Sequence, residues 1–203
     1  APTDTLGNDG KGAPVSYTGM TWSGFRPSDD ACDWGYLVPA NFFASVVLGY
    51  LAEIAREVLN HRRLERRAMS LQSAIVEGIE KHAVVQHPDY GEIYCYETDG
   101  AGHHLLMDDA NVPSLLSLPL LGAIANDSPR YLNTRRFILS ADNPYFHHGR
   151  FAQGVGSPHT PPGFIWPIAL AVQGLTARDP AEKLAMIQMM TATDAGSGLM
   201  HES

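Results

Sequence analysis

Apolar residues recur at steps of three and four through much of the chain, the spacing of an amphipathic helix. Segments with this pattern, about six in all, are each expected to form one helix: 41–60, 64–86, 113–124, 130–140, 166–176 and 180–194. The apolar stripe of the first expected helix consists of Phe43, Val47, Tyr50, Leu51, Ile54 and Val58. The pattern therefore predicts a mainly helical fold.

The pattern changes at Gly91. Residues 92–97 have the composition of a strand, Asp99-Gly100 is a turn signal, and residues 103–106 can form the returning strand. We therefore expect a small β-hairpin insertion near 92–106. Strands and helices do not alternate along the chain, which argues against a parallel α/β sheet and favours an all-α fold with this insertion.

Two long segments lack any periodic pattern. Residues 1–21 are rich in Gly, Thr, Pro and Asp and are expected to form a loop or linker. Residues 141–162 carry aromatic and histidine side chains between Gly and Pro residues. Long loops with such side chains usually contribute to function.

Composition narrows the classes of function. The 203 residues fit one domain or a large part of one, and the 44% of hydrophobic residues are enough for a buried core. A net charge of −8 argues against a nucleic-acid or anionic-membrane surface. No apolar run approaches the roughly 18 residues of a membrane span. The weak sequon at Asn126 leaves the compartment undecided, and Cys32 and Cys95 could form one disulfide or stay as free thiols.

Carboxylates concentrate in non-periodic stretches. Five stand out: Asp29, Asp30, Asp108, Asp109 and Glu202. Hydrolysis of a glycosidic bond needs two carboxyl groups, one that protonates the leaving oxygen and one that activates water or attacks the sugar. Aromatic residues that suit the apolar faces of sugars lie near them or in the long loop: Trp22, Trp34, Tyr145 and Trp166.

A structural role for the acids is also open. Ser28 suits an N-cap, so Asp29 and Asp30 could lie in the first turn of a helix, where the dipole favours negative charge. Asp108 and Asp109, shortly before Pro113, could cap the helix expected at 113–124. Capping and a site are equally compatible with the local sequence there.

Other chemistries have weaker support. The adjacent pairs His103-His104 and His147-His148 lack the spacing of zinc ligands, and no metal is expected. Ser157 is followed by a proline rather than a helix start, and Cys32 fits buried packing better than catalysis. The residues alone therefore favour a sugar-active enzyme, with a non-catalytic helical carbohydrate-binding or scaffold module as the alternative.

Several motifs resemble those of one protein family and occur in the same order along the chain. Residues 23–31 (SGFRPSDDA) resemble a segment of glycoside hydrolase family 125, the exo-α-1,6-mannosidases, and residues 107–116 (MDDANVPSLL) resemble its next signature. The others, also in the family's order, are NTRR at 133–136, GSPHT at 156–160, WPIA at 166–169 and MHES at 200–203. The resemblance covers residues 20–203.

The resemblance implies metal-independent, inverting removal of terminal α-1,6-linked mannose, with no cofactor. The acid would be one of Asp29 and Asp30, with Asp29 favoured, and the base would be Glu202. Residues that would contact the sugar are Arg26, Asp108, Asp109, Asn111, His159, Trp22 and His201.

The family fold implied is an (α/α)6 barrel of twelve helices, of which residues 22–203 would form the C-terminal half. We expect the N-terminal half to be supplied by a separate segment or chain, either because the enzyme is divided or because this is a fragment. Half a barrel would expose the apolar faces meant for the missing helices.

Overall fold

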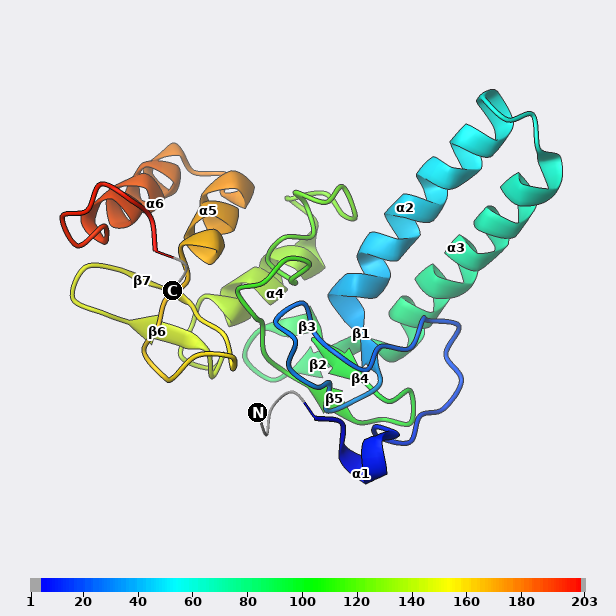
Figure 1. Ribbon diagram of the computed structural model, residues 1–203, viewed down its shortest axis with the longest axis horizontal. Helices are drawn as coiled ribbons and strands as arrows, with labels where there is room; N and C mark the ends of the chain where they lie inside the picture. Colours follow the sequence, from blue (N-terminus) through cyan, green and yellow to red (C-terminus); the bar gives the residue numbers. More distant parts are fainter. Residues whose placement is uncertain (1–4, 202–203) are drawn as a thin grey trace.

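Helix pairs form two ends of the molecule, and small sheets and a single helix lie between them (Figure 1). The computed structural model describes residues 5–201. At one end, α2 (Val38–Glu57) packs along α3 (Arg62–His82). At the other, α5 (Pro167–Thr176) packs against α6 (Pro180–Ala192). Helix α4 (Pro129–Ile138) packs on a strand of the central region, so the sheets connect the two ends.

All strand pairs in the described part of the chain are antiparallel, as the absence of strand–helix alternation predicts. The central sheet has the order β1 (Tyr36–Leu37), β4 (Glu97–Thr98), β5 (His104–Leu105). Two separate hairpins pair β2 (Val84–His87) with β3 (Gly91–Tyr94), and β6 (Phe146–His148) with β7 (Gln153–Val155). Strand β4 therefore has a partner on both sides, and the segment before α2 is joined to the middle of the chain.

The expected hairpin near 92–106 is present in part. Glu97 pairs with Leu105 and Thr98 with His104, on either side of the turn at Asp99-Gly100. Residues 91–94 pair instead with 84–87, and the sequence pattern assigned residues 84–86 to the end of the second helix. That helix ends at His82, and β-branched Val84 and Val85, which favour strands, begin β2.

The helix expected over 113–124 is wrong, because the structure has a series of turns there. Pro119 interrupts the segment and offers no backbone N–H for a helical hydrogen bond. The hydroxyl groups of Ser114 and Ser117 bond backbone N–H groups within the same segment, and these bonds compete with a helix. The other five expected helices are present, with ends shifted by a few residues.

The apolar stripe of α2 lies largely on the surface. The side chains of Phe43, Val47, Tyr50, Ile54 and Val58 are between 40% and 73% exposed. The residues that α2 buries are instead near its start or are small, such as Phe42, Ala52 and Ala55. This apolar face of the hairpin is therefore left uncovered by the described chain.

Helix α2 also corrects the expectation about apolar runs. It is 20 residues long with a mean hydropathy of 1.5 in its most apolar window, so by length and composition alone it could cross a membrane. In the fold, its first residues, including Val38, belong to the hydrophobic core, and it pairs with α3. The start of the helix therefore belongs to the core, whereas its apolar stripe does not.

The segment 5–21 is mostly loop, with one short helical turn, α1 (Gly7–Gly10), where Asn8 and Asp9 have left-handed φ values of 54° and 53°. The rest of the segment packs on the folded chain. Ser16 N–H donates to the Asp99 carbonyl at 2.9 Å, and the Thr21 N–H donates to the Asn41 side chain at 2.7 Å. This segment therefore follows the surface of the central sheet and the start of α2.

Close packing of this segment on α3 gives a testable prediction. A Cβ at Gly78 would overlap the backbone carbonyl oxygen of Thr18. Replacing Gly78 with alanine is therefore expected to lower the free energy of unfolding by about 1–3 kcal/mol, the usual cost of overpacking. Alanine would otherwise favour the helix by about 1 kcal/mol. Urea unfolding of the variant and of the parent protein measures the difference in their free energies of unfolding.

Gly49→Ala in α2 is the matched control. Its Cβ would meet only the side-chain amide of Gln72, which can move. We expect its stability to stay within about 1 kcal/mol of the parent or to rise. If Gly78→Ala were as well tolerated as Gly49→Ala, the contact between α3 and residue 18 would be looser than the structure has it.

Candidate active site

The motif at residues 25–31 forms a tight turn. Phe25 and Ala31 pair as an isolated bridge, Arg26 N–H donates to the Asp30 carbonyl at 2.8 Å, and Asp29 N–H donates to the Arg26 carbonyl at 3.0 Å. The helix expected to start at Ser28 is absent, and the next helix begins only at Val38. The physical reason is local, because these cross-turn bonds and the left-handed φ of 68° at Asp29 close the chain back on itself.

The turn places its two aspartates in different environments. Asp29 is exposed, whereas Asp30 is 1% exposed. The Ser28 hydroxyl donates to Asp30 Oδ2 at 2.7 Å, and His159 Nδ1 lies 3.6 Å from the same oxygen. The other oxygen, Oδ1, is buried and has no hydrogen-bond partner. Ser28 therefore contacts the carboxylate of Asp30 instead of capping a helix.

A cavity of about 490 Å³ lies beside this turn, and we refer to it as the Asp30 cavity. Its charged and phenolic lining consists of Arg26, Asp30, Asp33 and Tyr145. Further lining comes from the segment 5–13 and from Pro158. Burial raises the pKa of Tyr145, and the carboxylates of Asp33, Asp109 and Asp30 add to the rise. Residues from distant parts of the chain therefore meet here.

Arg26 is a buried cation held on several sides. Its Nε donates to Glu97 Oε1 at 2.6 Å, and its Nη2 donates to Asp33 Oδ2 at 3.1 Å. The guanidinium carbon lies 5.7 Å from the centre of the Tyr96 ring, within the range of a cation–π contact. Burial alone would lower the pKa of Arg26, but Glu97 raises it, so the guanidinium stays charged.

The second aspartate pair is also buried, but its two members differ. Asp108 accepts the backbone N–H groups of Leu115 and Leu116, at 2.8 and 2.9 Å. It thus caps the segment 113–124 even though no helix forms there. Burial raises the pKa of Asp108 to about 8, although these two donors act in the opposite direction. Its role is therefore structural in the observed geometry.

Asp109 leaves one oxygen free. Its Oδ1 accepts both the backbone N–H and the side-chain amide of Asn111, at 3.1 and 2.9 Å. Its Oδ2 is buried and has no partner. Asn111 therefore orients Asp109 and uses its own amide in doing so.

Three buried side-chain oxygens in the described part of the chain have no hydrogen-bond partner: Asp30 Oδ1, Tyr96 Oη and Asp109 Oδ2. Buried polar atoms in native proteins are nearly always satisfied, so these three are exceptions, and of their residues Asp30 lines the Asp30 cavity. Burial raises the pKa of Tyr96 well above its usual value, and the charge of Asp109 adds to the rise.

His159 and Trp22 flank the turn differently. His159 is 48% exposed and faces Asp30. Trp22 is half exposed, and its indole lies against the backbone at Gly24 and Gly35. Trp22 is not among the residues that line the Asp30 cavity.

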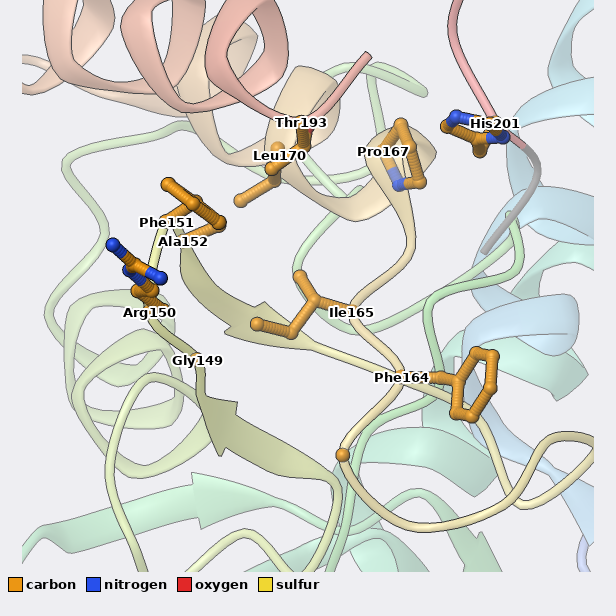
Figure 2. A pocket seen from close by; sticks show the side chains of 11 residues that line it. Gly149, Arg150, Phe151, Ala152, Phe164, Ile165, Pro167, Leu170, Thr193 and His201 are labelled. Atoms are coloured by element: carbon orange, nitrogen blue, oxygen red, sulfur yellow. The ribbon is translucent and has the colours of Figure 1, made fainter. Parts of the chain in front are cut away.

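His201 lies in another cavity. This second cavity, of about 290 Å³, is bounded by the loop between β6 and β7, the residues before α5, and Thr193 (Figure 2). Its lining is mainly apolar and includes Phe151, Phe164 and Leu170. The structure therefore does not place His201 in the Asp30 cavity, and the expected base, Glu202, lies outside the described residues.

Other candidates from the sequence have structural explanations. Cys32 and Cys95 are both buried free thiols, and burial raises the pKa of each. The Ser157 hydroxyl accepts the His159 N–H within a turn. Among residues 5–201, no cluster of three His, Cys, Asp or Glu side chains could hold a metal ion.

A sequence profile described as metal-independent α-mannosidase (GH125) matches residues 1–203. The chain belongs to this family. It is 44% identical over 203 residues to the meiotically up-regulated gene 157 protein of Schizosaccharomyces pombe, in a match that covers 99% of this chain and 40% of that protein. The resemblance read from the motifs is thereby confirmed.

A solved structure of a GH125 α-mannosidase from Streptococcus pneumoniae, in a non-productive complex with α-1,6-mannobiose, agrees with this fold at a TM-score of 0.97 and 49% identity. The match covers 100% of this chain and 48% of that one. The chain thus spans less than half the length of both relatives.

Three residues around the GH125 motif at 25–31 were not predicted as site residues: Asp33, Tyr96 and Glu97. Glu97 carried a signal, because it is a lone acid at the end of the otherwise apolar and aromatic run 93–96. A charge in a buried strand needs a partner, and that requirement points to an arginine elsewhere in the chain. Tyr145 was among the aromatic residues expected to suit a sugar, and it lines the Asp30 cavity.

Proposed function

We propose that this chain contributes the acid side of the active site of an inverting exo-α-1,6-mannosidase. The observation that carries the proposal is the buried Asp30 carboxyl group at the cavity, with one oxygen held by Ser28 and the other without a partner. A proton on this carboxyl group could pass to the leaving oxygen of a glycoside. Glu202 would be the base that activates water on the opposite face of the sugar.

The choice of Asp30 differs from the residue that the resemblance favoured. Asp29 is exposed, and Asp30 is the member of the pair that lines the cavity. Sugar contacts would come from Arg26, from the free oxygen of Asp109 and from His159. Asn111 would act by orienting Asp109, and Asp108 by holding the backbone at 115–116.

The proposal includes an (α/α)6 barrel whose other helices belong to the remainder of a longer polypeptide or to a separate chain. Support comes from the exposed apolar stripe of α2 and from the apolar residues left exposed on α5 and α6, such as Leu175 and Ile187. The length of the relatives agrees with it, since this chain covers 40% and 48% of them. The alternative is a fragment that binds carbohydrate or acts as a scaffold but does not catalyse.

Hydrolysis of α-1,6-mannobiose, compared with its α-1,2 and α-1,3 isomers, tests the function. We expect the full-length polypeptide to cleave the α-1,6 isomer preferentially and to release mannose first as the β-anomer, because inversion changes the configuration at the anomeric carbon. Proton NMR follows the anomers before they equilibrate. Release of the α-anomer would contradict the assigned base, and binding of mannobiose without cleavage would favour the scaffold alternative.

A further inference from the structure

Glu97 is a carboxylate in the interior of the protein. Its side chain is fully buried, and its two oxygens accept hydrogen bonds from different groups. Oε1 accepts from Arg26 Nε at 2.6 Å, and Oε2 accepts from the Trp34 backbone N–H at 2.9 Å. Burial raises the pKa of Glu97, and the charge of Arg26 opposes the rise. The two side chains therefore depend on each other to remain charged in the interior.

The backbone that carries Glu97 is fixed. Strand β4 is the middle strand of its sheet, with Glu97 paired to Leu37 on one side and to Leu105 on the other. The Trp34 N–H holds the second carboxylate oxygen. The carboxylate thus has little freedom to rotate and offers Arg26 one defined position.

The other partners of Arg26 are less restrictive. The side chain of Asp33 is 63% exposed, so solvent weakens its ion pair with Nη2. The Tyr96 ring supports one face of the guanidinium without fixing its rotation in the plane. Of the guanidinium nitrogens, Nη1 donates to none of the residues that the structure describes. Because Arg26 lines the Asp30 cavity, the Nη1 donors are the ones left for a ligand.

We propose that Glu97 is a positioning residue, which holds the Arg26 guanidinium through Nε so that its Nη1 edge can bind a hydroxyl group of the mannoside. The proposal rests on the proposed function for the identity of the ligand. A guanidinium has a rigid, planar set of donors, so an anchor on Nε fixes the direction of the opposite edge. The backbone N–H of Arg26 also bonds the Asp30 carbonyl, which ties this edge to the acid in one turn.

Chemical rescue tests the anchor separately from the general stability of the fold. Arg26→Ala is expected to lower kcat/KM for α-1,6-mannobiose by about 10²-fold, the scale of a lost positioning contact. Added guanidinium chloride at millimolar concentration should restore part of the activity, because the ion can occupy the vacated position beside Glu97. In Arg26→Ala/Glu97→Gln, which lacks the carboxylate, the same ion should restore nothing.

The single variant Glu97→Gln should raise KM more than it lowers kcat, because it weakens a contact with the bound sugar. Glu92→Gln, which removes a surface carboxylate on β3, is the matched control and should leave both constants unchanged. Equal rescue with and without Glu97 would overturn the proposal. A Glu97→Gln protein with a lower melting temperature but unchanged KM would also overturn it, because the role of Glu97 would then be structural only.

A second readout does not need turnover. Guanidinium should raise the melting temperature of Arg26→Ala slightly through binding to the folded state, and should only destabilise Arg26→Ala/Glu97→Gln. If the parent protein cleaves no mannoside, the proposed function fails while this measurement still decides whether Glu97 anchors a guanidinium. If the parent cleaves mannobiose but neither rescue nor a thermal shift depends on Glu97, the positioning role fails alone.

Discussion

Replacing Asp30 with asparagine is expected to lower kcat for α-1,6-mannobiose by about 10²–10⁴-fold, the range that general acid catalysis contributes. Asparagine keeps the size of the side chain and its bond from Ser28, but it cannot give a proton to the leaving sugar. The loss should be much smaller for 2,4-dinitrophenyl α-mannoside, whose leaving group departs without protonation. Steady-state kinetics on the two substrates measure the difference.

Asp29→Asn is the informative comparison for the acid. Because Asp29 is exposed whereas Asp30 is buried and lines the cavity, we expect Asp29→Asn to lower kcat much less than Asp30→Asn does. Asp127→Asn, on a surface turn, controls for the loss of one charge. A larger loss in Asp29→Asn, with the same dependence on the leaving group, would reverse the assignment of the acid.

Stability is expected to fall between about pH 4 and pH 8 because of Asp108, whose pKa is raised by burial to about 8. The folded state keeps the proton over this range, whereas the unfolded chain releases it near pH 4. The stabilisation is therefore complete below pH 4 and is lost as the pH rises through 8, with a total on the order of a few kcal/mol. Urea unfolding of the full-length polypeptide at pH 5 and pH 8 tests it.

Asp108→Asn isolates this contribution from other titrating groups. The amide accepts only one of the N–H groups of Leu115 and Leu116, so the variant should be about 1–3 kcal/mol less stable than the parent at pH 5. Between pH 5 and pH 8 the variant should lose less stability than the parent does. The difference in free energy of unfolding between the two proteins should therefore narrow. A gap that stays constant or widens towards pH 8 would contradict a neutral Asp108.

Local patterns predicted the helices well because each long helix carries its own periodic signal. They failed where side chains compete with the backbone, as at Ser114, Ser117 and Pro119, and where one long pattern continued past His82 into a strand. The stripe on α2 was read correctly as apolar, but periodicity does not say what an apolar face will contact. Its exposure follows from the tertiary arrangement alone.

The candidate site was predictable only as far as its motifs extend. Arg26, Asp30 and Asp109 were found because they lie in dense, non-periodic segments. The different burial of Asp29 and Asp30 was not predictable, since it depends on the left-handed conformation at Asp29. The contact between Arg26 and Glu97 joins positions 71 residues apart in the sequence. A local sequence pattern cannot predict a contact between such distant positions.

The two-residue strand β4 also limits how this protein can change in length. Side chains alternate between the two faces of a sheet, so one residue gained or lost between Tyr94 and Glu97 would turn the carboxylate away from Arg26. The α2–α3 connection lies outside this constraint and can absorb insertions. Over evolutionary time, therefore, insertions and deletions are expected to be tolerated least at the short connection that leads from Tyr94 into β4.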